Sequence, residues 1–180
     1  MNIIRIVFLL SCVLLTVACK KEDCSLKGDW VALEYPEWKT ILSEPQKAEF
    51  IKYLQTAGVK DMDSQRVSSC DLNADGTLEL IFTMDTDTGG QTQWKILTWK
   101  DSNEWSEIGE IPFCIAVFDD GGTWKYFSAN EILSDNELCD NIYRYSNGKY
   151  RLTEKVFKTY HKIERGIQID KVIRVEKIRE

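Results

Sequence analysis

From Val67 to the C-terminus, short runs of β-branched and aromatic residues alternate with clusters of turn-forming residues. Because successive side chains of a strand point to opposite faces, such runs, bounded by Gly, Asn, Asp and Ser, indicate strands. Asn147-Gly148 favours a two-residue hairpin turn, and the charged, alternating Gly166–Ile178 suits an exposed edge strand. The other predicted strands are Leu78–Met84, Gln93–Trp99, Phe113–Phe118, Thr123–Phe127, Asn141–Tyr145 and Tyr150–Val156. The pattern predicts an α+β fold, mainly an antiparallel β meander that forms a blade-like sheet.

One N-terminal helix is predicted ahead of these strands, beginning at Ser43. Ser43 and Gln46 have the spacing of a capping box, and Pro45 lies in the first turn, where its missing N–H does no harm. Apolar residues then recur at helical spacing, and Gly58 suits a left-handed C-terminal cap. No period of about 20–50 residues recurs along the chain, so we do not expect it to form a full propeller or solenoid by itself.

The composition is that of one small, acidic domain. The chain has 180 residues, 29 Asp and Glu against 23 Lys and Arg, and a formal charge of −6. This balance argues against nucleic acid as a partner, because binding to phosphates needs clustered basic residues. The single histidine, His161, removes most triad and multi-histidine metal chemistries, and no P-loop or Gly-x-Ser-x-Gly motif is present. We therefore expect a binding protein and not an enzyme.

The N-terminus has the pattern of a secretory signal. Ile6–Val17 is an apolar run of 12 residues, shorter than the roughly 20 that a spanning helix needs. A small residue and a charged stretch follow it, as in a signal peptide. The alternatives are an ordinary signal peptide cut at Ala18, without lipidation, and an N-terminal anchor helix.

The segment Leu15-Thr16-Val17-Ala18-Cys19 resembles the lipobox of bacterial lipoproteins, with Thr16 where that family usually has Leu. The resemblance implies cleavage before Cys19, diacylglycerol on its thiol, and an outer membrane lipoprotein whose domain lies in the periplasm or at the cell surface. The implied organisation is a signal peptide at 1–18, a tether at 19–29 and a β-rich domain with a calcium loop at 30–180.

Four cysteines remain in such a mature chain: Cys24, Cys70, Cys114 and Cys139. An even number in an oxidising compartment favours two disulfides. Three connectivities are then open, and the sequence does not choose among them. The alternative is four buried free thiols.

The stretch Asp71–Glu79 concentrates oxygen-bearing side chains. Asp71, Asn73, Asp75 and Glu79 alternate along it, and Gly76 permits a sharp turn that brings the Thr77 main-chain carbonyl within reach. Calcium takes six to eight oxygen ligands at about 2.3–2.6 Å, so this pattern predicts a calcium site. An EF-hand would also need an acid at its twelfth position, which is Phe82 here, and flanking helices.

The pattern Asp-x-Asn-x-Asp-Gly-x-x-Glu-Leu, continuing directly into a strand, resembles the calcium loop of FG-GAP and VCBS-type repeats. Glu79 stands where that family more often has Asp. The resemblance implies a β-propeller or related sheet module of an extracellular or periplasmic protein, with a structural ion. The alternative is an acidic β-turn without a metal. A second acidic stretch, 85–90, is predicted to be a solvated hairpin end.

These observations together predict an envelope-anchored lipoprotein that acts as a binding module and carries a structural calcium site. Its expected partners are the membrane, through the lipid anchor, and a protein of the cell envelope. The alternative function is that of an inhibitor or immunity lipoprotein that neutralises an envelope-targeted toxin or hydrolase. A cell-wall hydrolase that uses paired carboxylates is a third, weaker hypothesis.

Overall fold

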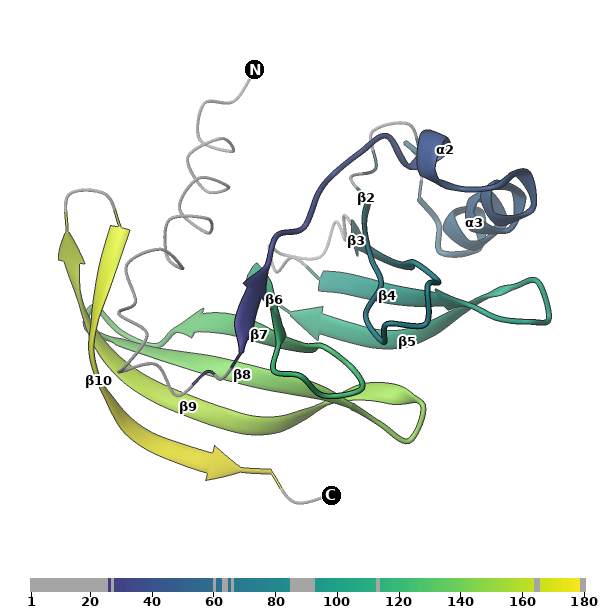
Figure 1. Ribbon diagram of the computed structural model, residues 1–180. Helices are drawn as coiled ribbons and strands as arrows, with labels where there is room; N and C mark the ends of the chain where they lie inside the picture. The colour runs from purple at the N-terminus through teal and green to yellow at the C-terminus, as the bar shows by residue number, and fades with distance from the viewer. Residues whose placement is uncertain are drawn as a thin grey trace.

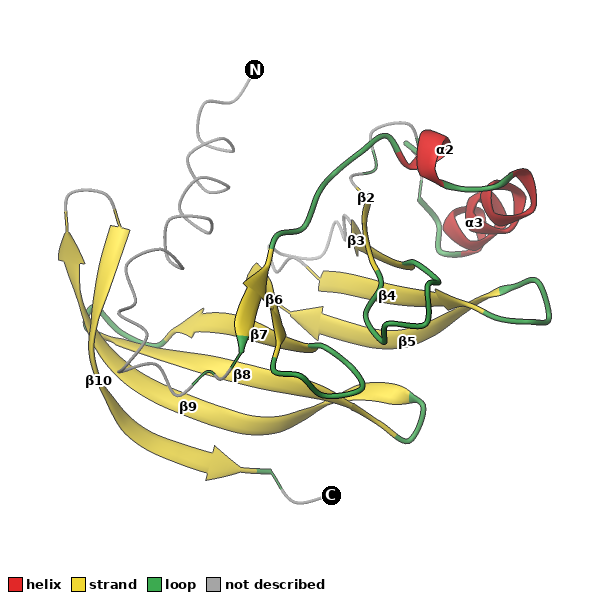
Figure 2. Cartoon of the chain, in the orientation of Figure 1, coloured by secondary structure: helices red, strands yellow, loops and turns green. Residues whose placement is uncertain are grey.

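The computed structural model describes residues 26, 28–59, 61–62, 65, 67–84, 93–112, 114–163 and 166–178. The predicted signal peptide (1–18), Cys19 and most of the predicted tether lie outside these residues. Within them, no helix combines the length and the apolar character needed to cross a bilayer. The described chain forms two antiparallel sheets with two helices beside the first (Figures 1 and 2), so the prediction of a mainly antiparallel β fold is confirmed.

The strands form one four-stranded and one six-stranded sheet, and every neighbouring pair is antiparallel. The first sheet has the order β2 (Val67–Cys70), β3 (Glu79–Met84), β4 (Gln93–Trp99), β5 (Trp105–Pro112). The second has the order β1 (Asp29–Val31), β6 (Cys114–Asp119), β7 (Tyr126–Ile132), β8 (Glu137–Ser146), β9 (Lys149–Ile163), β10 (Gly166–Lys177). β10 pairs with β9 alone and forms an edge, as its charged sequence predicts.

Among the described residues, two helices precede the first sheet, whereas one was predicted. α3 (Glu44–Thr56) begins where expected, and the Gln46 side chain accepts the Ser43 backbone N–H at 3.0 Å. α2 (Trp38–Ile41) has four residues, too few to show a helical period in the sequence. Such a short helix depends on packing, and here buried Trp38 meets Phe50 of α3 edge-to-face at 5.3 Å between ring centroids.

The first sheet is buried on both faces, and β3 shows how. Leu80 and Phe82 pack against the helices, whereas Ile81 between them packs against the second sheet. The molecule therefore has three layers, with α2 and α3 outermost, the first sheet in the middle and the second sheet on the other side. A strand that is buried on both faces has a continuous run of apolar residues in its sequence, and in β3 this run is Leu80–Phe82.

The two sheets approach most closely where β5 meets β9. A Cβ on Gly109 would lie 3.0 Å from Ile96 Cδ1 and 3.1 Å from Tyr150 Cβ. The contact between the sheets therefore requires glycine at position 109.

Strands β2–β5 and β6–β9 are two successive meanders of the same order. In each, the loop between the first two strands contains an Asp-Gly step, Asp75-Gly76 in one and Asp120-Gly121 in the other. This repetition is not evident in the sequence, because the two loops differ in length and β9 runs far beyond the predicted Tyr150–Val156.

Candidate cation-binding loop

The loop from Asp71 to Leu78 joins β2 to β3 and is organised by hydrogen bonds from its own backbone. The Asp71 carboxylate accepts the N–H of Asp75 at 3.2 Å and that of Gly76 at 3.0 Å. Two residues adopt the left-handed conformation that the turn needs, Ala74 at φ 59° and Gly76 at φ 85°. Gly76 does so at no steric cost, whereas Ala74 does so against the preference of its side chain.

Asn73 and Asp75 lie together with Asp71 in this turn. Asn73 Oδ1 accepts the Asp75 N–H at 3.1 Å, and Asn73 Nδ2 donates to Asp75 Oδ2 at 2.7 Å. The Thr77 N–H donates to Asp75 Oδ1 at 2.7 Å, and this bond, with that from Asn73, holds the pKa of Asp75 below its usual value. The structure thus brings three of the predicted ligand side chains into one exposed turn.

Glu79, the fourth predicted ligand side chain, points into the protein instead. It has no exposed surface. Its carboxylate accepts the Leu72 N–H at 2.8 Å and the Thr98 hydroxyl at 3.0 Å. Burial raises the pKa of Glu79 above its usual value, against the opposing effect of these two hydrogen bonds. Glu79 therefore holds the loop against the sheet from inside, a role that sequence spacing alone does not reveal.

The loop is also tied to the second sheet, through Lys125. The Lys125 N–H donates to the Leu72 carbonyl at 2.7 Å, and its Nζ donates to the Asp71 carbonyl at 2.7 Å. The Tyr150 hydroxyl in turn donates to the Lys125 carbonyl at 2.8 Å. The sequence carried no signal for Lys125, because it lies 54 positions from Asp71.

The corresponding loop of the second meander has basic partners for its carboxylates. Arg144 Nη1 lies 2.7 Å from Asp120 Oδ2, and Lys125 Nζ lies 3.8 Å from Asp119 Oδ2. The Arg144 hydrogen bond lowers the pKa of Asp120. In the first loop, by contrast, no described Lys or Arg side chain forms an ion pair with the carboxylate of Asp71, Asp75 or Glu79. Two equivalent turns therefore differ in how their negative charge is balanced.

The donor chemistry of the first loop suits a hard cation. Two carboxylates, an amide oxygen and main-chain carbonyls are the oxygen ligands that calcium takes. Among the described residues, no group of three or more His, Cys, Asp or Glu side chains is arranged to hold a metal ion. This agrees with the inward orientation of Glu79, which leaves two carboxylates at the exposed turn. The second acidic stretch, 85–90, lies outside the described residues.

The cysteines do not form a disulfide where the structure describes them. Cys70 and Cys139 have free thiols, and burial raises the pKa of both. The side chain of Cys114 and the whole of Cys24 lie outside the described residues. The Cys114 backbone is two strands away from Cys139, roughly 9.5 Å, beyond the reach of a disulfide. The predicted pairing of the four cysteines, whose connectivity the sequence left open, stays a prediction where it involves Cys24 or Cys114.

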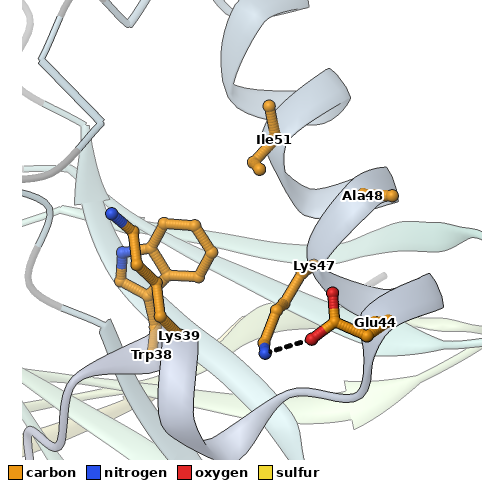
Figure 3. Close-up of a pocket in the computed structure, with 6 residues that line it drawn as sticks. All are labelled: Trp38, Lys39, Glu44, Lys47, Ala48 and Ile51. Carbon is orange, nitrogen blue, oxygen red and sulfur yellow. Dashed lines mark hydrogen bonds and ion pairs between the residues drawn. The ribbon is translucent and has the colours of Figure 1, made fainter.

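Other polar and aromatic groups lie apart from the loop. His161 Nδ1 is 2.6 Å from Asp170 Oδ1 on the exposed β9–β10 pair. Trp105 and Tyr126 are buried and therefore serve the core. An open cavity of about 330 Å³ lies beside α2 and α3 (Figure 3), where Glu44 and Lys47 neutralise each other at 2.7 Å.

Comparison with known proteins finds no matching family model, no similar curated protein and no similar solved structure.

Proposed function

We propose that this protein is an envelope-anchored lipoprotein that acts as a binding module and whose Asp71–Glu79 loop holds a structural calcium ion. The observation that supports the ion most directly is the contrast between the two equivalent loops. The second loop balances its carboxylates with Arg144 and Lys125, whereas the first gathers Asp71 and Asp75 without a described basic side chain in ion-pair contact. A bound cation would supply the missing positive charge.

In this proposal Asp71, Asn73, Asp75 and the Thr77 main-chain carbonyl hold the ion. Glu79 positions the loop from beneath, through the Leu72 N–H and the Thr98 hydroxyl. The ion would relieve the repulsion between the two exposed carboxylates and stiffen the turn. Because Lys125 bonds to the carbonyls of Asp71 and Leu72, a stiffer turn would also strengthen the contact between the sheets.

The anchor is proposed on Cys19, after removal of residues 1–18. Its support is the lipobox resemblance, together with the position of the first described strand. β1 begins at Asp29 and Leu26 already packs against the fold, which leaves about six residues as a tether between Cys19 and the fold. The protein partner, an envelope component, is proposed from the same location. Replacing Cys19 with Ala should abolish incorporation of labelled fatty acid into the chain.

Calcium titration of residues 20–180 tests the ion. We expect the melting temperature to rise with calcium, by an amount that corresponds to about 2.7 kcal/mol when the ion is at about 100 times its dissociation constant. Asp75→Ala should remove this rise, because it removes a ligand whose oxygens already bond Asn73 and Thr77.

Asp101→Ala is the matched control, since Asp101 is an exposed turn residue of the same sheet. It should keep the full response to calcium. An unchanged melting temperature in the unaltered protein, or an equal response in the Asp75→Ala variant, would contradict the calcium proposal.

A further inference from the structure

The C-terminal hairpin of strands β9 and β10 carries a charge opposite to that of the rest of the chain. Residues 149–180 contain ten Lys or Arg and five Asp or Glu, which gives a net charge of +5. The other 148 residues contain 13 Lys or Arg and 24 Asp or Glu, which gives −11. A protein that is acidic overall thus has one basic structural unit, at the edge of its larger sheet (Figure 1).

Exposed apolar side chains lie on β10, the outer strand of this hairpin, which itself has three Lys or Arg against two Asp or Glu. Ile173 is 49% exposed and Val175 is 46% exposed, and Ile178 follows at 41%. Lys171 and Lys177 are also exposed, and no ion pair of either is present among the described residues. Basic and apolar side chains together are the combination that binds the interface of an anionic membrane.

The backbone of β10 argues against a protein strand as the partner of this edge. Its pairing with β9 is interrupted by register shifts between Ile169 and Lys171 and between Val172 and Arg174. Such bulges twist an edge away from regular hydrogen bonding and prevent the addition of another strand. The side chains of the edge, and not its backbone, are therefore what it offers to a partner.

The path of the chain places this edge on the side of the proposed anchor. Leu26 and Val172 of β10 pack against the same small cluster of Tyr126, Ile142 and Val156. Leu26 lies seven positions after Cys19, and an extended chain covers at most about 3.6 Å per position, so the anchor is within about 25 Å of Leu26. Leu26, the described residue nearest to Cys19 in the sequence, thus lies at the same cluster as β10.

We infer that the basic β9–β10 hairpin lies, with the exposed side chains of β10, against the anionic lipid surface that holds the anchor. This inference rests on the proposed lipid anchor for its geometry, and it adds a second point of membrane contact. The lipid anchor and a basic patch act together, since each basic residue near an anionic surface adds to the binding. The docked orientation would keep α2, α3 and the acidic bulk of the domain away from the lipid.

The test is lysine footprinting of the full chain reconstituted into vesicles. A membrane-impermeant, amine-reactive reagent is applied to vesicles of phosphatidylglycerol with phosphatidylcholine, and to vesicles of phosphatidylcholine alone. In the anionic vesicles, the labelling rates of Lys171 and Lys177 should fall by about fivefold, the factor expected for one basic residue held at such a surface. Lys52 and Lys100, exposed on α3 and on the β4–β5 turn, are internal controls and should label equally in both.

Two double variants with the same change of charge test whether Lys171 and Lys177 themselves cause the protection. Lys162, which is 68% exposed at the end of β9, should also be protected in anionic vesicles, and Lys171→Glu with Lys177→Glu should abolish this protection. Lys52→Glu with Lys100→Glu should leave that protection intact. Sodium chloride at about 0.5 M, where the screening length is roughly 4 Å, should also remove it.

The inference would be overturned if Lys171 and Lys177, like the control lysines, were labelled at the same rate in anionic and in neutral vesicles. It would also be overturned if neutral vesicles protected Lys171 and Lys177, relative to the control lysines, as strongly as anionic vesicles do. Protection by a soluble acidic polysaccharide without vesicles, at least as strong as that by anionic lipid, would also overturn it in favour of another ligand. The outcome is separable from that of the anchor proposal. Incorporation of labelled fatty acid tests the anchor on Cys19, whereas the comparison of lysine labelling in anionic and neutral vesicles tests the contact of β10 with the lipid.

Discussion

Glu79 is the residue at which charge and burial are most directly opposed in this protein. Its carboxylate has no exposed surface and bonds only neutral donors, the Leu72 N–H and the Thr98 hydroxyl. Transfer of a charge to such a site is unfavourable unless the charge is paired. The raised pKa is the consequence, and it means that protonation of Glu79 favours the folded state.

The sign of the pH effect follows from this shift. A carboxyl group whose pKa is higher in the folded than in the unfolded state contributes stability below its unfolded pKa, and this contribution is lost as the pH rises through the folded pKa. Glu79→Gln removes the charge and keeps both contacts, because an amide can accept the Leu72 N–H and donate to the Thr98 hydroxyl. We expect this variant to be more stable than the unaltered protein at pH 7, by about 1 kcal/mol.

Urea unfolding in the presence of a calcium chelator measures this difference. The gain should disappear at about pH 3, more than one pH unit below the unfolded pKa, where Glu79 is protonated in both states. Glu34→Gln, at an exposed position, should show no gain at either pH. A Glu79→Gln variant less stable than the unaltered protein at pH 7 would show that the charge itself is stabilising.

At the scale of the elements, the contact between β5 and β9 depends on Gly109. Its backbone conformation is open to any residue, so the constraint is the space between Ile96 and Tyr150. Strand β5 was not among the predicted strands, because Trp105–Pro112 contains Gly109, two Glu and a Pro, all of which weaken a strand pattern. Gly109 therefore weakens the strand pattern in the sequence and also leaves the space that the contact between the sheets needs.

Gly109→Ala should destabilise the protein by about 1–3 kcal/mol, the usual cost of overpacking a filled interior. The reason is that Tyr150 Cβ, 3.1 Å from the added methyl group, is fixed to its backbone and cannot move alone. Thermal unfolding checks this value. Gly122→Ala is the control, since its nearest neighbour at 3.0 Å is a side-chain oxygen of Asp120, and it should change the melting temperature little.

At the scale of the whole molecule, Lys125 joins the first sheet to the second. Its backbone N–H, its carbonyl and its ammonium group each bond a residue of the facing meander or of β9. Lys125→Met keeps the backbone bonds and the apolar part of the side chain but loses the bond from Nζ to the Asp71 carbonyl. We expect a loss of about 1.5–3 kcal/mol, as for a hydrogen bond with a charged partner.

Chemical unfolding followed by tryptophan fluorescence measures that loss. Lys52→Met is the control, because Lys52 forms an exposed pair with Glu49 on α3 at 3.1 Å, and such pairs contribute less than about 1 kcal/mol. Equal stability of the two variants would show that the ammonium group of Lys125 does not hold the sheets together.

Local features of this chain were determined by the sequence alone. Ser43, Gln46 and Gly58 mark the ends of α3, Gln93–Trp99 is a strand with the predicted bounds, and Asn147-Gly148 forms a hairpin turn. The turn at Asp71–Gly76 was likewise predictable, because side chains two to five positions apart bond to its backbone. Each of these features depends on contacts between residues close together in the chain, and the spacing of residues in the sequence predicts such contacts directly.

Only the tertiary structure decided which groups from distant positions meet. Glu79 turns inward because Leu72 and Thr98 offer it donors, and Lys125 reaches the loop because the second meander stacks on the first. Burial on both faces of the first sheet has the same origin, since residues one position apart on β3 belong to different cores. These outcomes depend on how the sheets pack. Packing brings together residues that are far apart in the sequence, and such contacts leave no local sequence pattern.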